Sequence, residues 1–331
     1  MRRTGKTRWG LVSIVAIVAL AGTGAGWKAA AALPDMRNPP DAKAPDHAAV
    51  ASADPQVPSA GPMAIDPAAF SPGACVAFPP TAGNRDLTVF LDAGHGGIDP
   101  GAVGTTESGQ TIYEADETLP VELDAMAILR SDGFRVVVSR TGATSVARLS
   151  SADVSDGELT IQGAHDDVAA RDVCANLAGA NVLVGIYFDA GISPYNAGSV
   201  TGYDGNREFS ADNLELATLV QTDVLAAMNA QGWGIPDEGV LPDGDLGSAT
   251  SSAAESYGHL LLLGPAEAGY FTTPSQMPGA LIEPLFITDP FEGTIAESTT
   301  GQHVIATGLA QAIEQYFAGP ARGAASATSG A

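Results

Sequence analysis

A single histidine in a glycine-rich loop is the first feature of this sequence that could do chemistry. His95 lies between Gly94 and the pair at 96–97, directly after the apolar-rich residues 89–92 that predict a buried strand. Glycines allow positive φ and keep the backbone close to whatever the imidazole binds. An imidazole at the C-terminal end of a central strand is well placed for metal binding or proton transfer. A histidine in an ordinary glycine-rich turn is the alternative.

A carboxylate at the end of an apolar strand is the second such feature. Residues 279–282 read Gly-Ala-Leu-Ile and lead directly into Glu283. Burying a charged carboxylate costs free energy unless it has a partner, so the position favours a functional role for Glu283 over chance. A carboxylate exposed at a sheet edge is the alternative.

Alternating strands and helices must position these residues. Such alternation predicts an α/β fold, a single domain with a largely parallel twisted sheet flanked by helices, which binds ligands at the C-terminal strand ends. His95, Tyr187 and Glu283 all fall at such ends, so we expect them to share one site. Strands are predicted at 87–92, 135–139, 182–187, 260–263 and 280–283, and helices over 118–133, 166–178, 210–228 and 305–316.

Several motifs in this order are specific to one family. They are the Gly-His-Gly-Gly run at 94–97, the Asp-Pro-Gly-Ala-Val-Gly run at 99–104, Arg171 ahead of Ala-Asn, and the strand that ends at Glu283. From about residue 87 to 317 the chain resembles the zinc-dependent N-acetylmuramoyl-L-alanine amidases of the amidase-3 family. For Arg171 itself we expect a solvated position on a helix.

The resemblance implies a set of active-site residues. His95 and Glu114 would bind Zn²⁺, and Glu283 would be the catalytic carboxylate. Glu114 is chosen because it precedes Leu119 by the five residues that the family has before its long helix. Glu117 is the fallback ligand, with a solvated glutamate favoured by the helix dipole as its ordinary interpretation.

The third zinc ligand that the resemblance implies is replaced. The family has a histidine after the strand at 182–186, where this chain has Tyr187. A phenol titrates near 10 and is an uncommon zinc ligand, so Tyr187 is expected to line the site or to substitute poorly. Asp189 shares its face of the extended chain and could supply an oxygen. His165, in an inserted loop, and His259, at the start of a predicted strand, could fold over the site. The alternatives are that Asp189 caps a loop, that His165 is a solvated loop residue and that His259 is an ordinary residue at a strand end.

Charge and cysteine content narrow the function classes. The net charge is −23, which argues against nucleic-acid partners. Cys75 and Cys174 are the only cysteines. In an exported chain they could form a disulfide, with two buried thiols as the alternative.

The N-terminal residues predict export. Four basic residues precede the apolar run at 11–21, followed by small residues suited to cleavage. We therefore expect secretion or a place in the extracytoplasmic cell envelope, with a membrane tether through 9–27 if the signal is uncleaved. The expected organisation is a signal peptide or anchor at 1–32, a Pro/Ala-rich linker at 33–80, an amidase-like catalytic domain at 81–318 and a disordered tail at 319–331.

Two functions follow from the resemblance. The first is hydrolysis, by zinc-activated water, of the amide between N-acetylmuramic acid and the L-alanine of the stem peptide, with peptidoglycan or muropeptides as substrate. The second is a catalytically inactive amidase-like protein that binds wall fragments or regulates another hydrolase. Tyr187 is the main support for this alternative, because the loss of a ligand commonly ends the chemistry of a metal site.

Overall fold

An eight-stranded sheet forms the centre of the molecule. The computed structural model describes residues 61–247 and 251–319. The strand order is β1-β2-β6-β3-β9-β12-β10-β11, and the central strands β6, β3, β9 and β12 are mutually parallel. The strands of this sheet are β1 (Met63–Ala64), β2 (Ala74–Phe78), β3 (Thr88–Ala93), β6 (Arg135–Arg140), β9 (Val182–Ile186), β10 (Ser199–Tyr203), β11 (Asp237–Pro242) and β12 (Gly279–Glu283).

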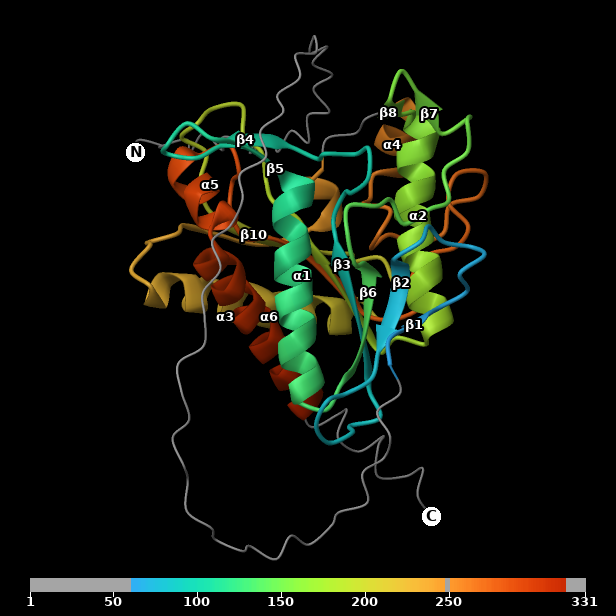
Figure 1. Cartoon of the computed structure of the whole chain (residues 1–331), viewed down its shortest axis with the longest axis horizontal. Coiled ribbons are helices and arrows are strands. Elements are labelled where there is room, and N and C mark those ends of the chain that lie inside the picture. Colours follow the sequence, from blue (N-terminus) through green and yellow to red (C-terminus); the bar gives the residue numbers. More distant parts are fainter. Residues whose placement is uncertain (1–60, 248–250, 320–331) are drawn as a thin grey trace, which may run out of the picture.

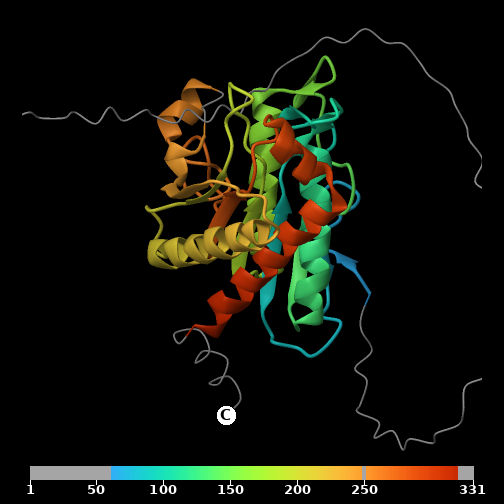
Figure 2. The same cartoon turned by 90° about the vertical axis from the view of Figure 1, so that its left-hand side faces the viewer.

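Helices cover both faces of this sheet. Helices α1, α3 and α6 lie together on one face and α2 lies on the other (Figure 1, Figure 2). The helices are α1 (Glu114–Ser131), α2 (Ile161–Ala178), α3 (Ser210–Ala230), α4 (Ser252–Tyr257), α5 (Pro290–Glu297) and α6 (Thr299–Ala318), with the short hairpins β4 (Val103–Thr105) to β5 (Thr111–Tyr113) and β7 (Val154–Ser155) to β8 (Glu158–Leu159).

The strand sequences explain this two-sided packing. Successive side chains of a strand point to opposite faces, and a sheet covered on both faces therefore needs apolar residues at every position. In β3, Val89 and Leu91 enter the core beneath α1, whereas Phe90 enters the core beneath α2. The predicted single α/β domain with a largely parallel sheet is confirmed.

Three predictions about the elements were wrong. The linker expected at 33–80 extends too far, because β1 and β2 pair with the sheet. The helix expected from Thr118 begins at Glu114, and Pro120 lies inside it rather than in its first turn. The leucine run at 260–263 forms turns instead of a strand.

Cys75 of β2 and Cys174 of α2 form a disulfide, which fastens the α2 layer to the sheet.

The predictions for 1–32 and for 320–331 lie outside the described residues. Within the described ranges, no helix is both long and apolar enough to span a membrane.

Glu122 of α1 fixes the end of β3, and this contact predicts a pH dependence of stability. Its Oε1 accepts hydrogen bonds from the backbone N–H groups of Ala93 and Ser139 and from the Ser139 hydroxyl, while its buried Oε2 has no partner. Burial, followed by the charge of Asp92, outweighs nearby Arg140 and raises the pKa of Glu122 from 4.5 to about 8.

Because the folded state holds this proton more tightly than the unfolded state, Glu122 contributes stability below pH 4.5 that is lost as the pH rises through about 8. We expect the free energy of unfolding, measured in urea, to fall over this window by about 1.4 kcal/mol for each pH unit that Glu122 dominates. Glu122→Gln should make the fall shallower. An unchanged slope in the variant would refute this role.

Candidate active site

His95 and Glu114 meet at the C-terminal end of β3. His95 follows β3, and Glu114 is the first residue of α1. The His95 backbone adopts φ 61°, a left-handed conformation that turns the imidazole toward α1. Its Nε2 lies 3.1 Å from Oε2 of Glu114, and its Nδ1 lies 2.9 Å from Oδ2 of Asp99. With Nδ1–H donating to Asp99, Nε2 faces Glu114 and can offer its lone pair to a metal ion once its own proton is removed.

Backbone donors hold the Glu114 carboxylate in place. The N–H of Ala102 donates to Oε2 at 2.9 Å, and the N–H of Phe188 donates to Oε1 at 3.0 Å. The carboxylate of Glu117 instead accepts a hydrogen bond from Gln302 of α6 at 2.9 Å. The structure thus brings Glu114, and not the fallback Glu117, beside His95.

The charges around His95 favour a cation at this point. Burial alone would lower the pKa of His95, but the carboxylates of Glu114 and Asp99 outweigh it and raise the pKa to about 10. In the metal-free chain both nitrogens of the His95 ring therefore carry a proton at neutral pH. A metal ion must displace the proton on Nε2, so metal binding releases it to solvent.

Glu283 and Asp189 form a carboxyl pair beside this group. Glu283 ends β12, and Asp189 follows β9, its neighbour in the sheet. The two side chains share a hydrogen bond, and Oε2 of Glu283 is buried without a hydrogen-bond partner. Burial, then the charges of Asp189 and Glu114, raises the pKa of Glu283 well above its ordinary value. Glu283 therefore holds its proton to a higher pH than an exposed glutamate does.

These residues fit a zinc ion. Two ligands of one tetrahedral zinc ion, each about 2.0–2.1 Å from it, lie about 3.3 Å apart, close to the separation of Nε2 of His95 and Oε2 of Glu114. The carboxyl groups of Asp189 and Glu283 add negative charge that a divalent cation would offset. The unpartnered Oε2 of Glu283 also lacks the polar neighbour that a buried carboxyl normally has.

Tyr187 directs its hydroxyl away from these ligands. The phenol O–H donates to Oδ2 of Asp92 at 3.2 Å, and the ring meets the edge of the His95 ring at a centroid distance of 5.4 Å. Burial and the charge of Asp92 raise the pKa of Tyr187 well above its ordinary value. The side chain therefore lines the site as a neutral phenol, and its hydroxyl group donates its hydrogen bond to Asp92.

Arg171 is buried, so its expected solvated position is wrong. Its guanidinium lies 2.5 Å from Asp92 and 2.8 Å from Asp167, and it donates to the carbonyl oxygens of Ala93 and His95 at 2.8 Å. Arg171 thus fixes the backbone that carries His95. Asp92 was the signal for it, because a charged residue within an apolar strand needs a buried partner.

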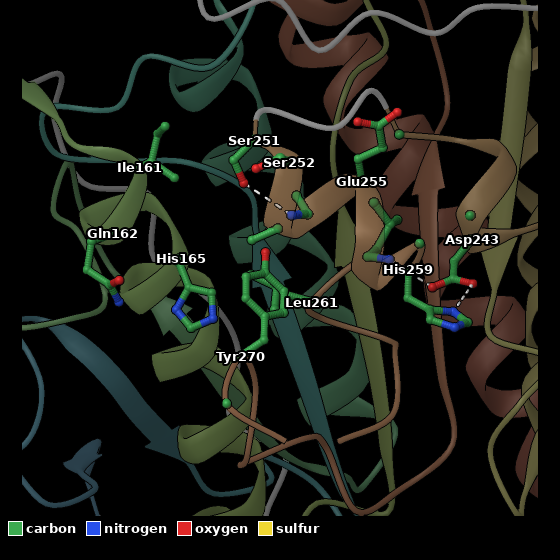
Figure 3. A pocket seen from close by; sticks show the side chains of 17 residues that line it. Ile161, Gln162, His165, Asp243, Ser251, Ser252, Glu255, His259, Leu261 and Tyr270 are labelled. Carbon is green, nitrogen blue, oxygen red and sulfur yellow. Dashed lines mark hydrogen bonds and ion pairs between the residues drawn. The ribbon is translucent and has the colours of Figure 1, made fainter. Parts of the chain in front are cut away.

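The two other candidate histidines, His165 and His259, lie elsewhere. His165 lies on α2 rather than in a loop, where it contacts Asp166 at 3.0 Å. His259 lies 2.9 Å from Asp204. Both line a separate cavity of about 910 Å³ whose walls include neither His95 nor Glu114 (Figure 3). Neither therefore acts as the replacement ligand beside His95.

Comparison with known proteins agrees with this fold. The model of the N-acetylmuramoyl-L-alanine amidase family (Amidase_3) matches residues 89–315, so the chain belongs to this family of cell-wall hydrolases. The amidase AmiA of Salmonella typhimurium is 27% identical over 256 residues, covering 69% of this chain and 75% of AmiA. The germination-specific N-acetylmuramoyl-L-alanine amidase of Bacillus subtilis is 25% identical over 229 residues, covering 69% of this chain and 79% of that protein.

A solved structure shares the fold. The CwlD amidase of Clostridioides difficile, solved in complex with the GerS lipoprotein, superposes with a TM-score of 0.52 at 22% identity. The match covers 70% of this chain and 98% of CwlD. The architecture of CwlD is therefore that of the domain described above.

Proposed function

We propose that this protein is a zinc-dependent amidase that cleaves the bond between N-acetylmuramic acid and the L-alanine of the stem peptide. The contact between His95 and Glu114, with protonatable Glu283 beside them, is the observation that carries the proposal. Family membership supports the substrate, peptidoglycan or its muropeptide fragments.

His95 and Glu114 would hold the zinc ion, and Asp189 is the candidate for a further oxygen ligand. When bound, the ion would polarise the scissile carbonyl and lower the pKa of water at the site. Asp99 and Arg171 position His95, the first through its Nδ1 and the second through its backbone carbonyl. This support leaves Nε2 of His95 directed at the ion.

Glu283 would move the proton that hydrolysis requires. A cation next to Glu283 stabilises its charged form, so the carboxylate can accept a proton from water. Its burial then favours donation of that proton to the departing amine of alanine. An inactive, fragment-binding protein is the weaker hypothesis, because it gives no reason for an unpartnered Glu283 oxygen beside His95 and Glu114.

The proposed hydrolysis of peptidoglycan and the net charge of −23 both suit an exported protein. We propose a secreted or cell-envelope location, with residues 1–32 as signal peptide or anchor, because peptidoglycan lies outside the cytoplasmic membrane. The test is fractionation of growing cells: the chain should be found in the medium, or be digested by added protease while the cytoplasmic membrane is intact and a cytoplasmic marker protein stays protected.

Activity should disappear when the metal beside His95 and Glu114 is lost. We expect the full chain with zinc to convert a muropeptide into free glycan and a peptide with a new N-terminal alanine, detected by mass spectrometry. Removal of metal by a chelator, or His95→Ala, should abolish this conversion. His303→Ala is the control, since His303 is an exposed residue that contacts Asp124. Full turnover by the chelated enzyme would overturn the zinc mechanism.

Tyr187→His should restore a third zinc ligand. A side chain at this position already reaches the ring of His95, and imidazole is a preferred zinc ligand. Because outer residues alone alter metal affinity about 10- to 100-fold, we expect a direct ligand to tighten zinc binding by about tenfold or more. Competition with a chromogenic chelator measures the affinity.

Tyr187→Phe is the matched variant. It removes the hydroxyl that bonds to Asp92 and keeps the ring against His95. We expect its zinc affinity to equal that of the parent. A weaker affinity in Tyr187→Phe would show that the phenol oxygen itself is a ligand.

A further inference from the structure

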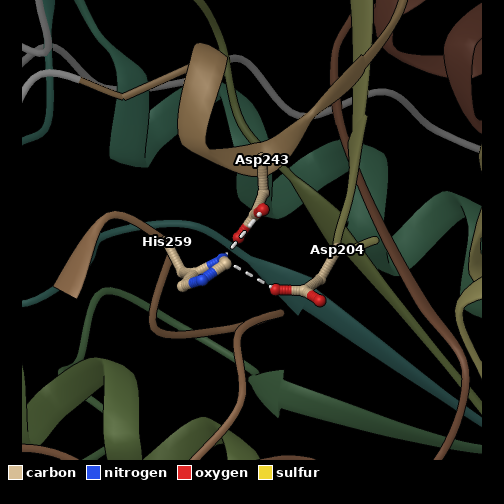
Figure 4. Close-up of side chains that lie close together, drawn as sticks. All are labelled: Asp204, Asp243 and His259. Carbon is tan, nitrogen blue, oxygen red and sulfur yellow. Dashed lines mark hydrogen bonds and ion pairs between the residues drawn. The ribbon is translucent and has the colours of Figure 1, made fainter. Parts of the chain in front are cut away.

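A second group of metal-ligating side chains lies outside the site described above. Asp204 follows β10, Asp243 begins the short 3-10 turn η1 (Asp243–Asp245), and His259 follows α4 (Figure 4). Nδ1 of His259 lies 2.9 Å from Oδ2 of Asp204 and 3.3 Å from Oδ1 of Asp243. Within residues 61–247 and 251–319, this is the group of three His, Cys, Asp or Glu residues whose ligand atoms all lie within 4.8 Å of one another.

The two carboxylates are buried and each is held by the backbone. The side chain of Asp204 is fully buried and that of Asp243 is 2% exposed. Asp204 accepts a hydrogen bond from the N–H of Asn206 at 2.6 Å, and Asp243 accepts one from the N–H of Leu260 at 2.9 Å. Each carboxylate therefore uses one oxygen for its loop and directs the other at His259.

A salt bridge with the imidazole leaves this group incomplete. One proton on Nδ1 can be donated well to only one of two oxygens, and Oδ2 of Asp204 accepts no hydrogen bond although it is buried. Two buried carboxylates also exceed the single charge of an imidazolium. A divalent cation about 2.0–2.2 Å from all three atoms would satisfy each of them. The distances of 2.9 and 3.3 Å from Nδ1 to the two carboxylate oxygens are close to the separation of about 3.3 Å between two ligands of such an ion.

The second nitrogen of His259 contacts the side-chain NH₂ group of Asn206. Nε2 lies 3.3 Å from the side-chain amide of Asn206. Through this contact the amide NH₂ group of Asn206 can donate to Nε2, which leaves the ring proton on Nδ1, facing Asp204 and Asp243. A metal ion at this point would displace that proton.

The group opens on a large cavity. Asp243 and His259 lie on one side of the 910 Å³ cavity, and His165 and Tyr270 lie on the other (Figure 3). A metal held by three side chains would therefore keep a coordination position accessible to water or to a ligand in the cavity. One nitrogen and two carboxylate oxygens suit zinc, whereas calcium and magnesium prefer oxygen ligands alone.

We propose that Asp204, Asp243 and His259 form a second metal site that binds zinc, separate from His95 and Glu114. The proposal goes beyond the amidase activity and does not depend on it. The site has three protein ligands and faces the cavity, so a bound zinc ion could receive a carboxylate or carbonyl oxygen of a molecule that enters there.

Zinc content of variants of the full chain tests the proposal. The chain is equilibrated with zinc, freed of excess by gel filtration and measured by elemental mass spectrometry. His95→Ala removes the first site, and we expect it to retain about one zinc ion per chain. Adding Asp243→Asn, or independently Asp204→Asn, to His95→Ala should reduce the zinc content to near zero. Adding the control His303→Ala should leave it unchanged.

Each outcome decides the proposal. No zinc in folded His95→Ala, or equal zinc after both aspartate substitutions, would overturn it. Circular dichroism establishes that each variant is folded, and the two aspartate variants provide independent measurements. Displacement of the zinc by millimolar calcium would overturn the assignment to zinc. The single variant Asp243→Asn keeps only the site at His95 and Glu114, so its zinc content measures that site. A failure of the first site and a failure of the second site are therefore distinguishable.

Discussion

We expect Glu283→Gln to lower the rate of muropeptide hydrolysis by about 10²- to 10⁴-fold, because glutamine cannot carry the proton, and we expect the fold and the zinc content to stay those of the parent. The substitution preserves the size of a buried side chain and its ability to hydrogen-bond to Asp189. It changes neither His95 nor Glu114. Single-turnover kinetics on a purified muropeptide, with zinc content measured on the same sample, would separate a loss of proton transfer from a loss of metal.

An exposed glutamate provides the control. Glu297, at the end of α5, contacts Gln110 on the surface, and Glu297→Gln should retain the parent rate. The pH dependence of the rate is a second readout. The rate of the parent should reflect the ionisation of Glu283, and the rate of Glu283→Gln should lack this dependence. Equal rates for Glu283→Gln and the parent would exclude Glu283 as the acid and base.

The sequence predicts the shared site well because strand ends are easy to place. Continuous apolar runs fix β3, β9 and β12, and parallel neighbours bring their C-terminal ends to the same edge of the sheet. His95, Asp189 and Glu283 therefore meet as a consequence of topology. The carboxyl contact between Asp189 and Glu283 depends on this pairing of β9 with β12.

The polar supports of the site could not be predicted in the same way. Arg171 lies 79 residues from Asp92 in sequence, so the charge of Asp92 within an apolar strand indicates a buried partner but does not identify it. Asp99 is close to His95 in sequence, but its role depends on the left-handed turn at His95. The sequence alone indicates that Tyr187 stands where the family has a histidine ligand, whereas its hydrogen bond to Asp92 is visible only in the structure.

The leucine run at 260–263 failed for a different reason. Its apolar composition fits a buried strand, and Leu262 and Leu263 are indeed buried. They enter the core beneath α2 from a turn, so burial alone does not distinguish a strand from an irregular segment. That turn places His259 between Asp204 and Asp243, and the second group of ligands was hidden from the sequence for this reason.

Arg171→Met should be among the most destabilising single changes in this chain, by about 3–5 kcal/mol, because it leaves the carboxylates of Asp92 and Asp167 buried without their cation. Urea unfolding followed by circular dichroism measures this cost. Arg148→Met is the matched control, since exposed Arg148 donates one hydrogen bond to Pro67, and its loss should cost about 1 kcal/mol.

A double variant tests the cause of this loss. Adding Asp92→Asn to Arg171→Met removes one uncompensated charge and should recover part of the stability, because a neutral amide is less costly to bury than a carboxylate. The hydroxyl of Tyr187 can still bond to the amide oxygen. If Arg171→Met costs no more than Arg148→Met, or if Asp92→Asn makes the loss larger, the buried ion pair is not what fixes the loop of His95.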